Sequence, residues 1–451
     1  MNLNDKSNGN QGVSRRRFLG GTAAAASLNI IPSRLLGQDA PSNKLNIAFI
    51  GAGGRGAANV NGCASAGQIV HALADVDENR VSSTRQKFPD AKFYKDWREM
   101  LEAEGDKIDA VGISTPDHTH AVAAMAAIKM GKHVYVEKPL TLTISEARAL
   151  HAEANKRGLC TQMGNTGHAA EGARLTNEWV QSGALGEIKT VHCRTNRPVW
   201  PQDLVRPAAE PVPAHMDWDL WIGPAAMKPY NGQIAPFKWR GYLDYGTGAL
   251  GDMGAHIIDH PTWALGLGVP EKVVVEKADR DTPGAEKDTH PQSCIIHMYF
   301  AAKGERGPVH LTWYDGKYKI PRVDGMPEDK NTPDNGCVYH GSEHVMMHGS
   351  HGGAPQIIDA NAAKFQAPPK TMERSPGHYK EWVDAIKSSD PSKAKSNFDV
   401  AAPLTETLLL GVIGSILGPG TELTWDAEKM TTGNAEADKW VSHNYRDGWS
   451  L

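Results

Sequence analysis

The 451-residue chain is 40% hydrophobic and 22% charged, which is the composition of an ordinary globular protein with room for two or three domains. Its formal net charge of -4 gives no electrostatic reason to expect nucleic acid or an acidic membrane surface as a partner. The five cysteines include no C-x-x-C pair, so we expect buried thiols and at most one or two disulfides.

The first 40 residues have the pattern of an export signal. Ser14 to Leu19 read S-R-R-R-F-L, and a weakly apolar, alanine-rich run follows to Ile31. This order predicts a twin-arginine signal peptide over residues 1–40, with cleavage near Ala40, rather than a merely basic tail. Because we see no other long apolar segment, we expect a periplasmic or otherwise exported protein without a membrane anchor after processing.

Residues 45–60 read L-N-I-A-F-I-G-A-G-G-R-G-A-A-N-V. The apolar run 45–50 has the length of a buried strand, and a helix is expected after the glycines. Gly51, Gly53 and Gly56 have G-x-G-x-x-G spacing, which suits a tight turn, close backbone approach to a pyrophosphate and close packing of helix on strand. Together with Gly54 and Arg55, they predict a dinucleotide site; the alternative is a plain glycine turn.

An acidic residue stands about 20 residues beyond these glycines, where a dinucleotide fold holds the adenosine ribose. Asp75 occupies that place, at the end of a second predicted strand over residues 69–74. Its carboxylate favours NAD over NADP, because it would repel a 2′-phosphate, whereas Arg55 and Arg80 leave NADP open. The alternative role for Asp75 is a helix N-cap, which Asp77 could fill instead.

Two further apolar strands are predicted over residues 109–114 and 133–136, with a helix over 121–130 between them. This alternation predicts an α/β fold with a parallel, doubly wound sheet, in which ligands bind beyond the carboxyl ends of the strands. Polar segments follow both strands at that edge. They are T-P-D-H-T-H, with Thr115, Pro116 and His120, and E-K-P-L, with Glu137 and Lys138.

Lys138 is a candidate for polarising a substrate hydroxyl, although a lone lysine at a strand end is more often a surface residue. It does not stand alone, because residues 251–260 read G-D-M-G-A-H-I-I-D-H and predict the start of a helix. Asp252, His256 and Asp259 would share one helical face, which is an acid–base arrangement. A metal bound by Asp252, His256 and His260 is the weaker alternative, because no third strong ligand stands at a usual spacing.

The second half of the chain changes character after a turn over residues 164–167, where we place the domain boundary. Residues 41–165 then form the dinucleotide domain and residues 166–451 the second domain. Successive strands over residues 188–196, 272–277, 294–300, 309–313 and 337–340 predict a mainly antiparallel sheet. Between the first two lies a loop over residues 198–239, rich in proline, tryptophan and tyrosine. Its aromatic residues suit either sugar stacking or packing of the loop; they are Trp200, Trp218, Trp221, Tyr230 and Trp239.

A run of four histidines over residues 340–351, around Gly341-Ser342, is a second possible metal site. The spacing of His340, His344 and His348 would converge only on a helix, and this segment reads as a hairpin. We therefore interpret these histidines, with His351, as loop or solvent-facing residues and predict no metal.

The chain resembles the Gfo/Idh/MocA oxidoreductases, which include glucose–fructose oxidoreductase and inositol dehydrogenase. The resemblance covers nearly all of the chain after residue 40 and rests on G-A-G-G-R-G, D-V-D, S-T-P-D-H-T-H, E-K-P-L and G-D-M-G-A-H-I-I-D. It implies a Rossmann domain, a second α/β domain with an open sheet, and a homo-oligomer. It also implies that Lys138 contacts nicotinamide ribose and substrate. Asp252 and His256 match the family's aspartate and histidine, with His256 as the general base toward a sugar or polyol.

Three functions remain open at this stage. The first is an exported NAD(P)-dependent sugar or polyol oxidoreductase. The second is an NAD-dependent glycosidase that oxidises its sugar transiently, against which the G-D-M-G-x-H segment counts. The third is a non-catalytic nucleotide-binding scaffold. Because a periplasm has no ready pool of NAD, we expect a tightly bound cofactor that is restored in place, by transhydrogenation or a redox-neutral cycle.

Overall fold

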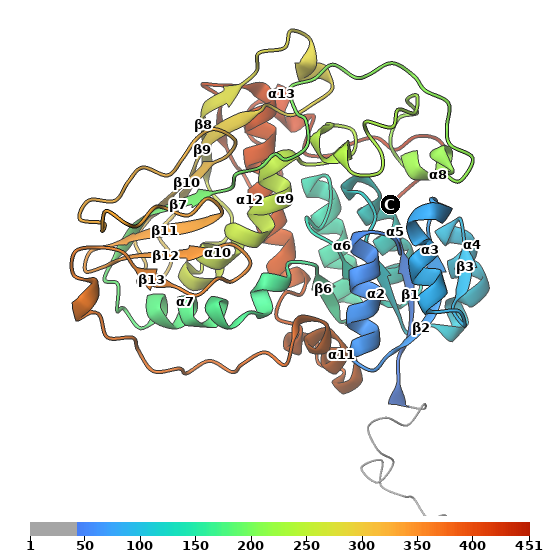
Figure 1. Ribbon diagram of the computed structural model, residues 1–451, viewed down its shortest axis with the longest axis horizontal. Coiled ribbons are helices and arrows are strands. Elements are labelled where there is room, and N and C mark those ends of the chain that lie inside the picture. Colours follow the sequence, from blue (N-terminus) through green and yellow to red (C-terminus); the bar gives the residue numbers. More distant parts are fainter. Residues whose placement is uncertain (1–42) are drawn as a thin grey trace, which may run out of the picture. The chain divides into compact units, whose positions relative to one another are not determined.

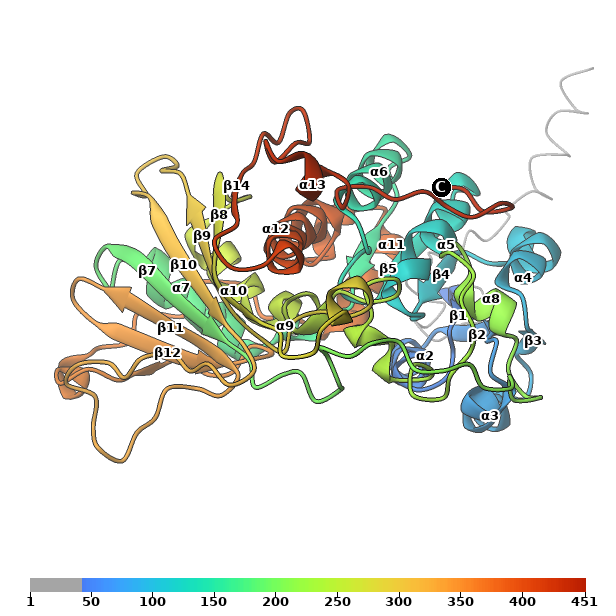
Figure 2. The same ribbon diagram turned by 90° about the horizontal axis from the view of Figure 1, so that it is seen from above.

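The computed structural model describes residues 43–451, so the predicted signal peptide over residues 1–40 lies outside the described residues. In the part from Leu45 onward, a parallel sheet and a second, larger sheet lie on either side of a layer of helices (Figures 1 and 2). The predicted combination of a doubly wound sheet and a second α/β domain is confirmed.

The first sheet has six strands, all parallel, in the order β3-β2-β1-β4-β5-β6. Its strands are β1 (Asn46–Ile50), β2 (Ile69–Ala74), β3 (Lys92–Tyr94), β4 (Ala110–Ile113), β5 (His133–Val136) and β6 (Thr161–Met163). The helices of this half are α2 (Arg55–Ser65), α3 (Glu78–Lys87), α4 (Trp97–Glu104), α5 (Asp117–Lys129) and α6 (Ile144–Lys156). The order reverses between β1 and β4, and ligands of such sheets bind at that point.

The second sheet has eight strands in the order β13-β12-β11-β7-β10-β9-β8-β14. Its strands are β7 (Ile188–Arg194), β8 (Lys272–Asp279), β9 (Ser293–Phe300), β10 (Val309–Tyr314), β11 (Gly336–Gly341), β12 (Val345–Gly349), β13 (Gln356–Ile357) and β14 (Glu422–Thr424). Only the pairing of β7 with β10 is parallel, so the predicted mainly antiparallel sheet is confirmed. The segment with the four histidines is the predicted hairpin, β11 to β12.

Helices fill the space between the two sheets, as Figure 2 shows. The helices of this half are α7 (Glu171–Gln181), α8 (Trp218–Ile222), α9 (Gly248–Ile257), α10 (Asp259–Leu265), α11 (His378–Ser388), α12 (Phe398–Leu417) and α13 (Ala435–Asp438). Helix α12 packs against α9, α6 and β8. It therefore connects the two sheets through one hydrophobic core.

Helix α12 corrects the expectation that the chain has no long apolar segment after its first 40 residues. With a mean hydropathy of 1.8, it is, among the described residues, the one helix long and apolar enough to cross a membrane. However, 78% of its most apolar window is buried inside the protein. Burial on nearly all sides explains this composition, since a helix in the middle of a core needs no polar face.

The end of the chain returns to the first sheet. Trp382 and Ala385 of α11 join the hydrophobic cluster that contains Phe49 and Tyr135 of the parallel sheet. Further on, the Trp449 ring lies 6.2 Å from that of Trp97 at the start of α4. Residues after 377 thus stabilise the dinucleotide half as well as their own, and the predicted boundary at residues 165 and 166 stays a prediction.

All five cysteines are buried free thiols, as expected. Cys193 on β7 and Cys337 on β11 face each other across the sheet, with their Sγ atoms 3.3 Å apart.

The glycine at the start of α2 allows a stability prediction. A Cβ on Gly56 would lie 1.7 Å from the carbonyl oxygen of Gly51, so Gly56→Ala should force helix and strand apart. We expect the free energy of unfolding in urea to fall by about 1–3 kcal/mol. Gly349→Ala is the control, because a Cβ there would meet only the Asn335 carbonyl oxygen at 3.9 Å. Equal effects from the two substitutions would contradict this packing role for Gly56.

Candidate functional site

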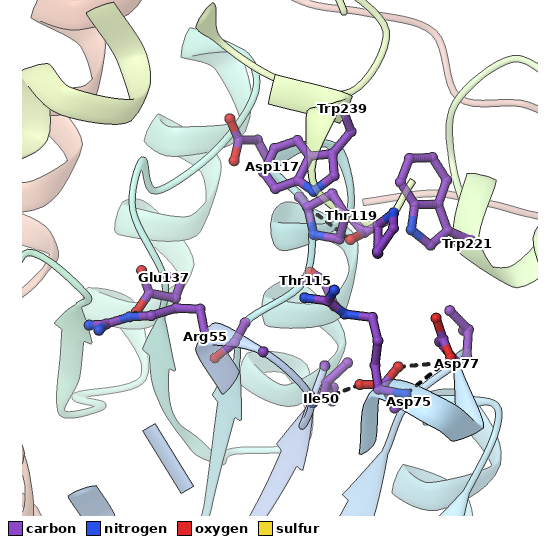
Figure 3. A pocket seen from close by; sticks show the side chains of 18 of the residues that line it. Ile50, Arg55, Asp75, Asp77, Thr115, Asp117, Thr119, Glu137, Trp221 and Trp239 are labelled. Carbon is purple, nitrogen blue, oxygen red and sulfur yellow. Dashed lines mark hydrogen bonds and ion pairs between the residues drawn. The ribbon is translucent and has the colours of Figure 1, made fainter. Parts of the chain in front are cut away.

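A pocket of about 510 Å³ lies beyond the carboxyl ends of β1, β2, β4 and β5. Its opposite wall belongs to the long segment between β7 and α9, residues 195–247, which we call the strap. In Figure 3, Trp221 and Trp239 of the strap reach into the pocket across from Arg55 and Asp75, which rise from the sheet side. The pocket therefore occupies the edge at which the sequence places the dinucleotide.

At two positions of the glycine loop, any side chain would clash with the neighbouring backbone. Gly51 has φ +75°, and a Cβ there would lie 2.8 Å from the backbone of Ser114. A Cβ on Gly53 would meet the backbone of Arg80 at 2.8 Å. Helix α2 begins directly after this loop, and its N-cap Gly54 offers no side chain to the first N–H groups. This bare helix start is suited to phosphate oxygens, so the loop fits a dinucleotide.

Asp75 and Asp77 have separate roles at the end of β2. Asp77 is the N-cap of α3 and accepts hydrogen bonds from the backbone N–H groups of Asn79 and Arg80. Asp75 accepts from the N–H of Gly53 at 2.8 Å and from that of Asp77 at 3.0 Å. Burial raises the pKa of Asp75 to about 6. Asp75 is therefore the residue placed beside the glycine loop, where a ribose would lie.

The choice between NAD and NADP can be tested at two neighbouring residues. The Arg80 guanidinium lies over Gly54, where it would favour a 2′-phosphate. We expect Asp75→Ala to raise the ratio of NADP to NAD affinity by roughly 10- to 100-fold, because NAD loses a buried hydrogen-bond acceptor. Arg80→Ala should lower that ratio. Tryptophan fluorescence titration of nucleotide-stripped protein measures both, and an unchanged ratio in both variants would contradict these assignments.

Glu137 joins the glycine loop to the end of β5. Its Oε1 accepts from Nε of Arg55 at 2.8 Å and from Nδ2 of Asn59 at 2.9 Å. Burial alone would raise the pKa of Glu137, but Arg55 and Lys138 outweigh it and hold that pKa below its usual value. The carboxylate is therefore ionised and fixes the segment that carries Lys138.

Lys138 reaches from the parallel sheet to α9. Its Nζ donates to Oδ1 of Asp252 at 2.6 Å and to the Asp252 carbonyl oxygen at 3.0 Å. Arg240 of the strap donates from Nε to the same Oδ1 at 3.2 Å. Burial would raise the pKa of Asp252, but Lys138 and Arg240 outweigh it and lower that pKa. Lys138 and Asp252, 114 residues apart, thus form one charged pair.

His256 lies one turn beyond Asp252 on α9 and lines the same pocket. Its Nδ1 is buried without a hydrogen-bond partner. Burial, Lys138 and His351 hold the pKa of His256 well below its ordinary value. The imidazole is therefore neutral near pH 7, which is the state of a general base.

Asp259 does not join this group, contrary to the expectation that it shares a face with Asp252 and His256. Helix α9 ends at Ile257 and α10 begins at Asp259, so the helical register is interrupted. The Asp259 carboxylate instead pairs with Nδ1 of His168 at 2.9 Å, where both residues are buried.

Most of the predicted site residues line the pocket. They are Gly51, Gly53, Gly54, Arg55, Asp75, Arg80, Thr115, Pro116, Glu137, Lys138 and His256. Gly56 is buried beneath the loop and Asp252 lies behind Lys138. His120 does not line the pocket, because its ring is buried and contacts two carbonyl oxygens, of Pro139 and Thr115, within 2.9 Å. His120 thus connects the T-P-D-H-T-H and E-K-P-L segments and does not face the pocket.

The sequence-based prediction missed several lining residues. They are Asp77, Lys95, Trp97, Asp117, Thr119, Phe237, Arg240 and His351. Asp117 could have been found from the sequence, since it lies in the T-P-D-H-T-H motif. Burial raises its pKa to about 6, and its carboxylate accepts from the Thr247 hydroxyl at 2.9 Å. Phe237 and Arg240 of the strap had no such signal in the sequence, because only tertiary contacts bring them to the pocket.

The aromatic residues of the strap mainly pack it. Trp218 stacks on Trp221 with 4.6 Å between ring centroids, and Tyr230 meets Trp218 edge-on. Trp200 is buried next to Arg240. Only Trp221 and Trp239 of the five candidate aromatic residues also line the pocket. The packing interpretation therefore holds for three of them.

The histidine run divides among several roles. His344 pairs with Asp359, and buried His348 contacts the Tyr339 hydroxyl. His348 lies buried on β12, so the expectation of a loop or solvent-facing residue is wrong for it. His351 is an exposed turn residue, as expected, and it also lines the pocket beside His256. Within residues 43–451, no group of three or more His, Cys, Asp or Glu residues is arranged to hold a metal ion.

Comparison with known families agrees with this geometry. Residues 45–165 match the family model of the Gfo/Idh/MocA oxidoreductases described as "NAD-binding Rossmann fold". Residues 180–301 match the model described as "C-terminal alpha/beta domain" of the same family. The two matches together cover more than half of the chain.

Curated relatives include a levoglucosan dehydrogenase of Pseudarthrobacter phenanthrenivorans, 25% identical over 49% of this chain and 51% of that protein. They also include an alpha-N-acetylgalactosaminidase of Shewanella oneidensis, 33% identical over 34% of this chain and 36% of that protein. The alignments thus span about half or less of these relatives.

Among solved structures, the WlbA dehydrogenase of Bordetella pertussis, in complex with NADH and UDP-GlcNAcA, has the same fold. Its TM-score is 0.60 at 14% identity, over 85% of this chain and 99% of that one. The two family matches, the glycine cradle beside Asp75 and the pair of Lys138 with Asp252 lead to one conclusion: the chain belongs to the Gfo/Idh/MocA family of NAD-binding oxidoreductases.

Proposed function

We propose that this protein is an exported NAD(P)-dependent oxidoreductase. It transfers a hydride between a hydroxyl-bearing carbon of a sugar or polyol and a tightly bound nicotinamide cofactor. One observation carries the proposal: Lys138, held by Asp252, and neutral His256 lie together at the glycine-loop pocket.

These residues supply the acid–base chemistry of a carbinol oxidation. The nicotinamide, when bound, provides the hydride acceptor. His256 takes the hydroxyl proton, for which its depressed pKa leaves it neutral and available. The Lys138 ammonium donates to the substrate oxygen and stabilises the negative charge that develops there, while Asp252 orients that ammonium. Trp221 and Trp239 supply apolar surface that excludes water from the pocket.

The contacts of the strap support tight retention of the cofactor. The N–H of Asp217 donates to the Val76 carbonyl at 2.9 Å, and that of Glu78 to the His215 carbonyl at 3.0 Å. The His215 ring contacts the Asp77 carboxylate at 3.0 Å. The strap is thus bonded to the turn that carries Asp75, on the side where adenosine would lie. A nucleotide that leaves toward this side must break these bonds.

The proposed export also supports tight retention of the cofactor. The twin-arginine pattern over residues 14–19 predicts transport of a folded protein into a compartment without a ready supply of NAD. A cofactor held by the strap would then be restored in place by a second substrate. From the family resemblance we also infer a homo-oligomer, which light scattering after gel filtration would test.

The deciding experiment uses protein purified from a host that has the twin-arginine pathway. Its nucleotide is identified by mass spectrometry after release by denaturation, and its redox state by absorbance. Levoglucosan, myo-inositol and methyl α-N-acetylgalactosaminide are then added to the same sample. We expect the bound nicotinamide to change redox state with at least one of them and to survive gel filtration. A protein without nucleotide, or one whose nicotinamide responds to no sugar or polyol, would refute the proposal and favour the scaffold function.

A redox-neutral glycosidase is the second candidate. The similarity to the Shewanella alpha-N-acetylgalactosaminidase favours it, and so does a cofactor that need not be released. Release of the aglycone from a nitrophenyl N-acetylgalactosaminide, with no net change in nicotinamide absorbance, would establish this function over the first.

A further inference from the structure

A second imidazole, that of His351, stands at the pocket with no role in the proposed oxidation. His351 follows β12 and has φ +59°, a left-handed conformation that is uncommon outside glycine, although asparagine, aspartate and histidine adopt it more often than other residues. Its N–H donates to the His256 carbonyl at 3.2 Å, and the next N–H, of Gly352, donates to Nε2 of His260 at 2.9 Å. The backbone is therefore fixed against α9 and α10 in a strained state, and such strain is concentrated at functional sites.

Two neighbouring segments of the chain pack closely against the backbone of this turn. A Cβ on Gly167 would lie 2.5 Å from Cα of His351, and a Cβ on Gly172 would lie 2.2 Å from the carbonyl oxygen of Gly352. Two glycines thus allow the segments around η3 (Thr166–Ala169) and α7 to approach the turn closely. The backbone of the turn is thus held close to the wall of the pocket.

The ring of His351 lies parallel to that of His256. Their centroids are 3.9 Å apart with 23° between the planes. Both residues line the pocket, but His256 is buried and His351 is exposed. Two parallel rings at this separation can face substituents on neighbouring carbons of one sugar ring, because each base needs to be only about 3 Å from its own proton.

The charges around His351 leave it unprotonated at neutral pH. Partial desolvation at the pocket wall, Lys138 and Arg55 lower its pKa, and Arg197 adds to this, against an opposite effect of Asp252. Its Nδ1 contacts the Ser350 hydroxyl at 3.0 Å. The ring therefore has a lone pair for a proton, and because it is exposed it can exchange that proton with water.

We propose that His351 is a second catalytic acid–base residue, which acts on the carbon next to the one that His256 and Lys138 help to oxidise. This inference rests on the proposed function, since oxidation to a carbonyl acidifies the neighbouring C–H. His351 takes that proton, the C–H electron pair forms a carbon–carbon double bond, and the carbonyl electrons move to the oxygen next to Lys138. The proton returns to the same carbon, or, where the following carbon carries a leaving group, the enolate collapses and expels it.

Hydrogen exchange in D₂O separates this step from hydride transfer. The as-purified protein is incubated in D₂O with whichever of levoglucosan, myo-inositol or methyl α-N-acetylgalactosaminide changes its nicotinamide absorbance, and the sugar is recovered for NMR. We expect deuterium at a carbon next to the oxidised one. His351→Asn tolerates the left-handed backbone and should reduce that incorporation by at least about 100-fold, the usual contribution of a general base. Nicotinamide should still be reduced by the sugar, with a loss much smaller than that of the deuterium incorporation.

His344→Gln is the matched control, because His344 lies in the same hairpin but pairs with Asp359 outside the pocket. Nucleotide content and melting temperature show that each variant is folded, and added imidazole should restore part of the exchange in His351→Asn. Nicotinamide reduction without deuterium incorporation, or incorporation that His351→Asn leaves intact, would overturn the role of His351 alone. If no sugar alters the nicotinamide, the proposed function fails, and this inference fails with it.

Discussion

Lys138→Met should lower turnover by at least about 1,000-fold, because the developing negative charge on the substrate oxygen loses its cationic donor. The nucleotide content should stay as in the unmodified protein, since the glycine loop and Asp75 are untouched. The fold should survive as well, because Asp252 keeps Arg240 as a partner, with Nε 3.2 Å from Oδ1. Turnover is measured by the change of nicotinamide absorbance with a substrate found in the panel.

Lys156→Met controls for loss of a positive charge, because Lys156 forms only an exposed pair with Glu153. Lys138→Arg should retain part of the activity, since it keeps the charge but not the position. A Lys138→Met protein with normal turnover would show that Lys138 has only a structural role in holding α9.

His256→Asn should lower turnover by roughly 10²- to 10⁴-fold, the usual contribution of a positioned general base. The pH profile gives a sharper signature. Burial and the nearby Lys138 depress the pKa of His256, so its base form persists as the pH falls through 6.5, and the acid limb of kcat/KM should lie below that pH. In His256→Asn this limb should vanish, and the residual rate should rise with pH as hydroxide replaces the missing base.

His151→Asn is the control for this variant, because His151 contacts Asp399 on α12 and does not line the pocket. Added imidazole should partly restore the His256→Asn rate but not the Lys138→Met rate. If His256→Asn kept the acid limb of the parent protein, the general base would have to be another group.

The sequence predicts the parallel sheet well because its strands are short apolar runs that end in glycine or polar residues. The three-residue strands β3 and β6 escaped prediction, because K-F-Y and T-Q-M carry no apolar pattern. Their strand geometry comes from pairing with β2 and β5 at the two edges of the sheet.

Sequence motifs located Lys138, Asp252 and His256 because each motif lies within a short stretch of the chain. E-K-P follows β5 directly, and Asp252 and His256 are one helical turn apart on α9. Arg240 and His351 could not be found in this way, because their positions depend on the fold of the strap and on the turn after β12. The same reason explains the failed expectation for Asp259: the periodicity argument assumed one continuous helix, and the break after Ile257 redirects that carboxylate to His168.

The apolar character of α12 bears on the proposed export of this protein through the twin-arginine pathway. A translocation channel that threads unfolded chains samples each segment in turn, and twenty residues with a mean hydropathy of 1.8 would meet its lateral gate as a stop-transfer signal. The chain would then lodge in the bilayer partway through. Once folded, α12 is enclosed between α9, α6 and β8 and cannot be recognised. On the proposed export, a pathway for folded cargo would therefore keep this helix enclosed as well as the cofactor bound.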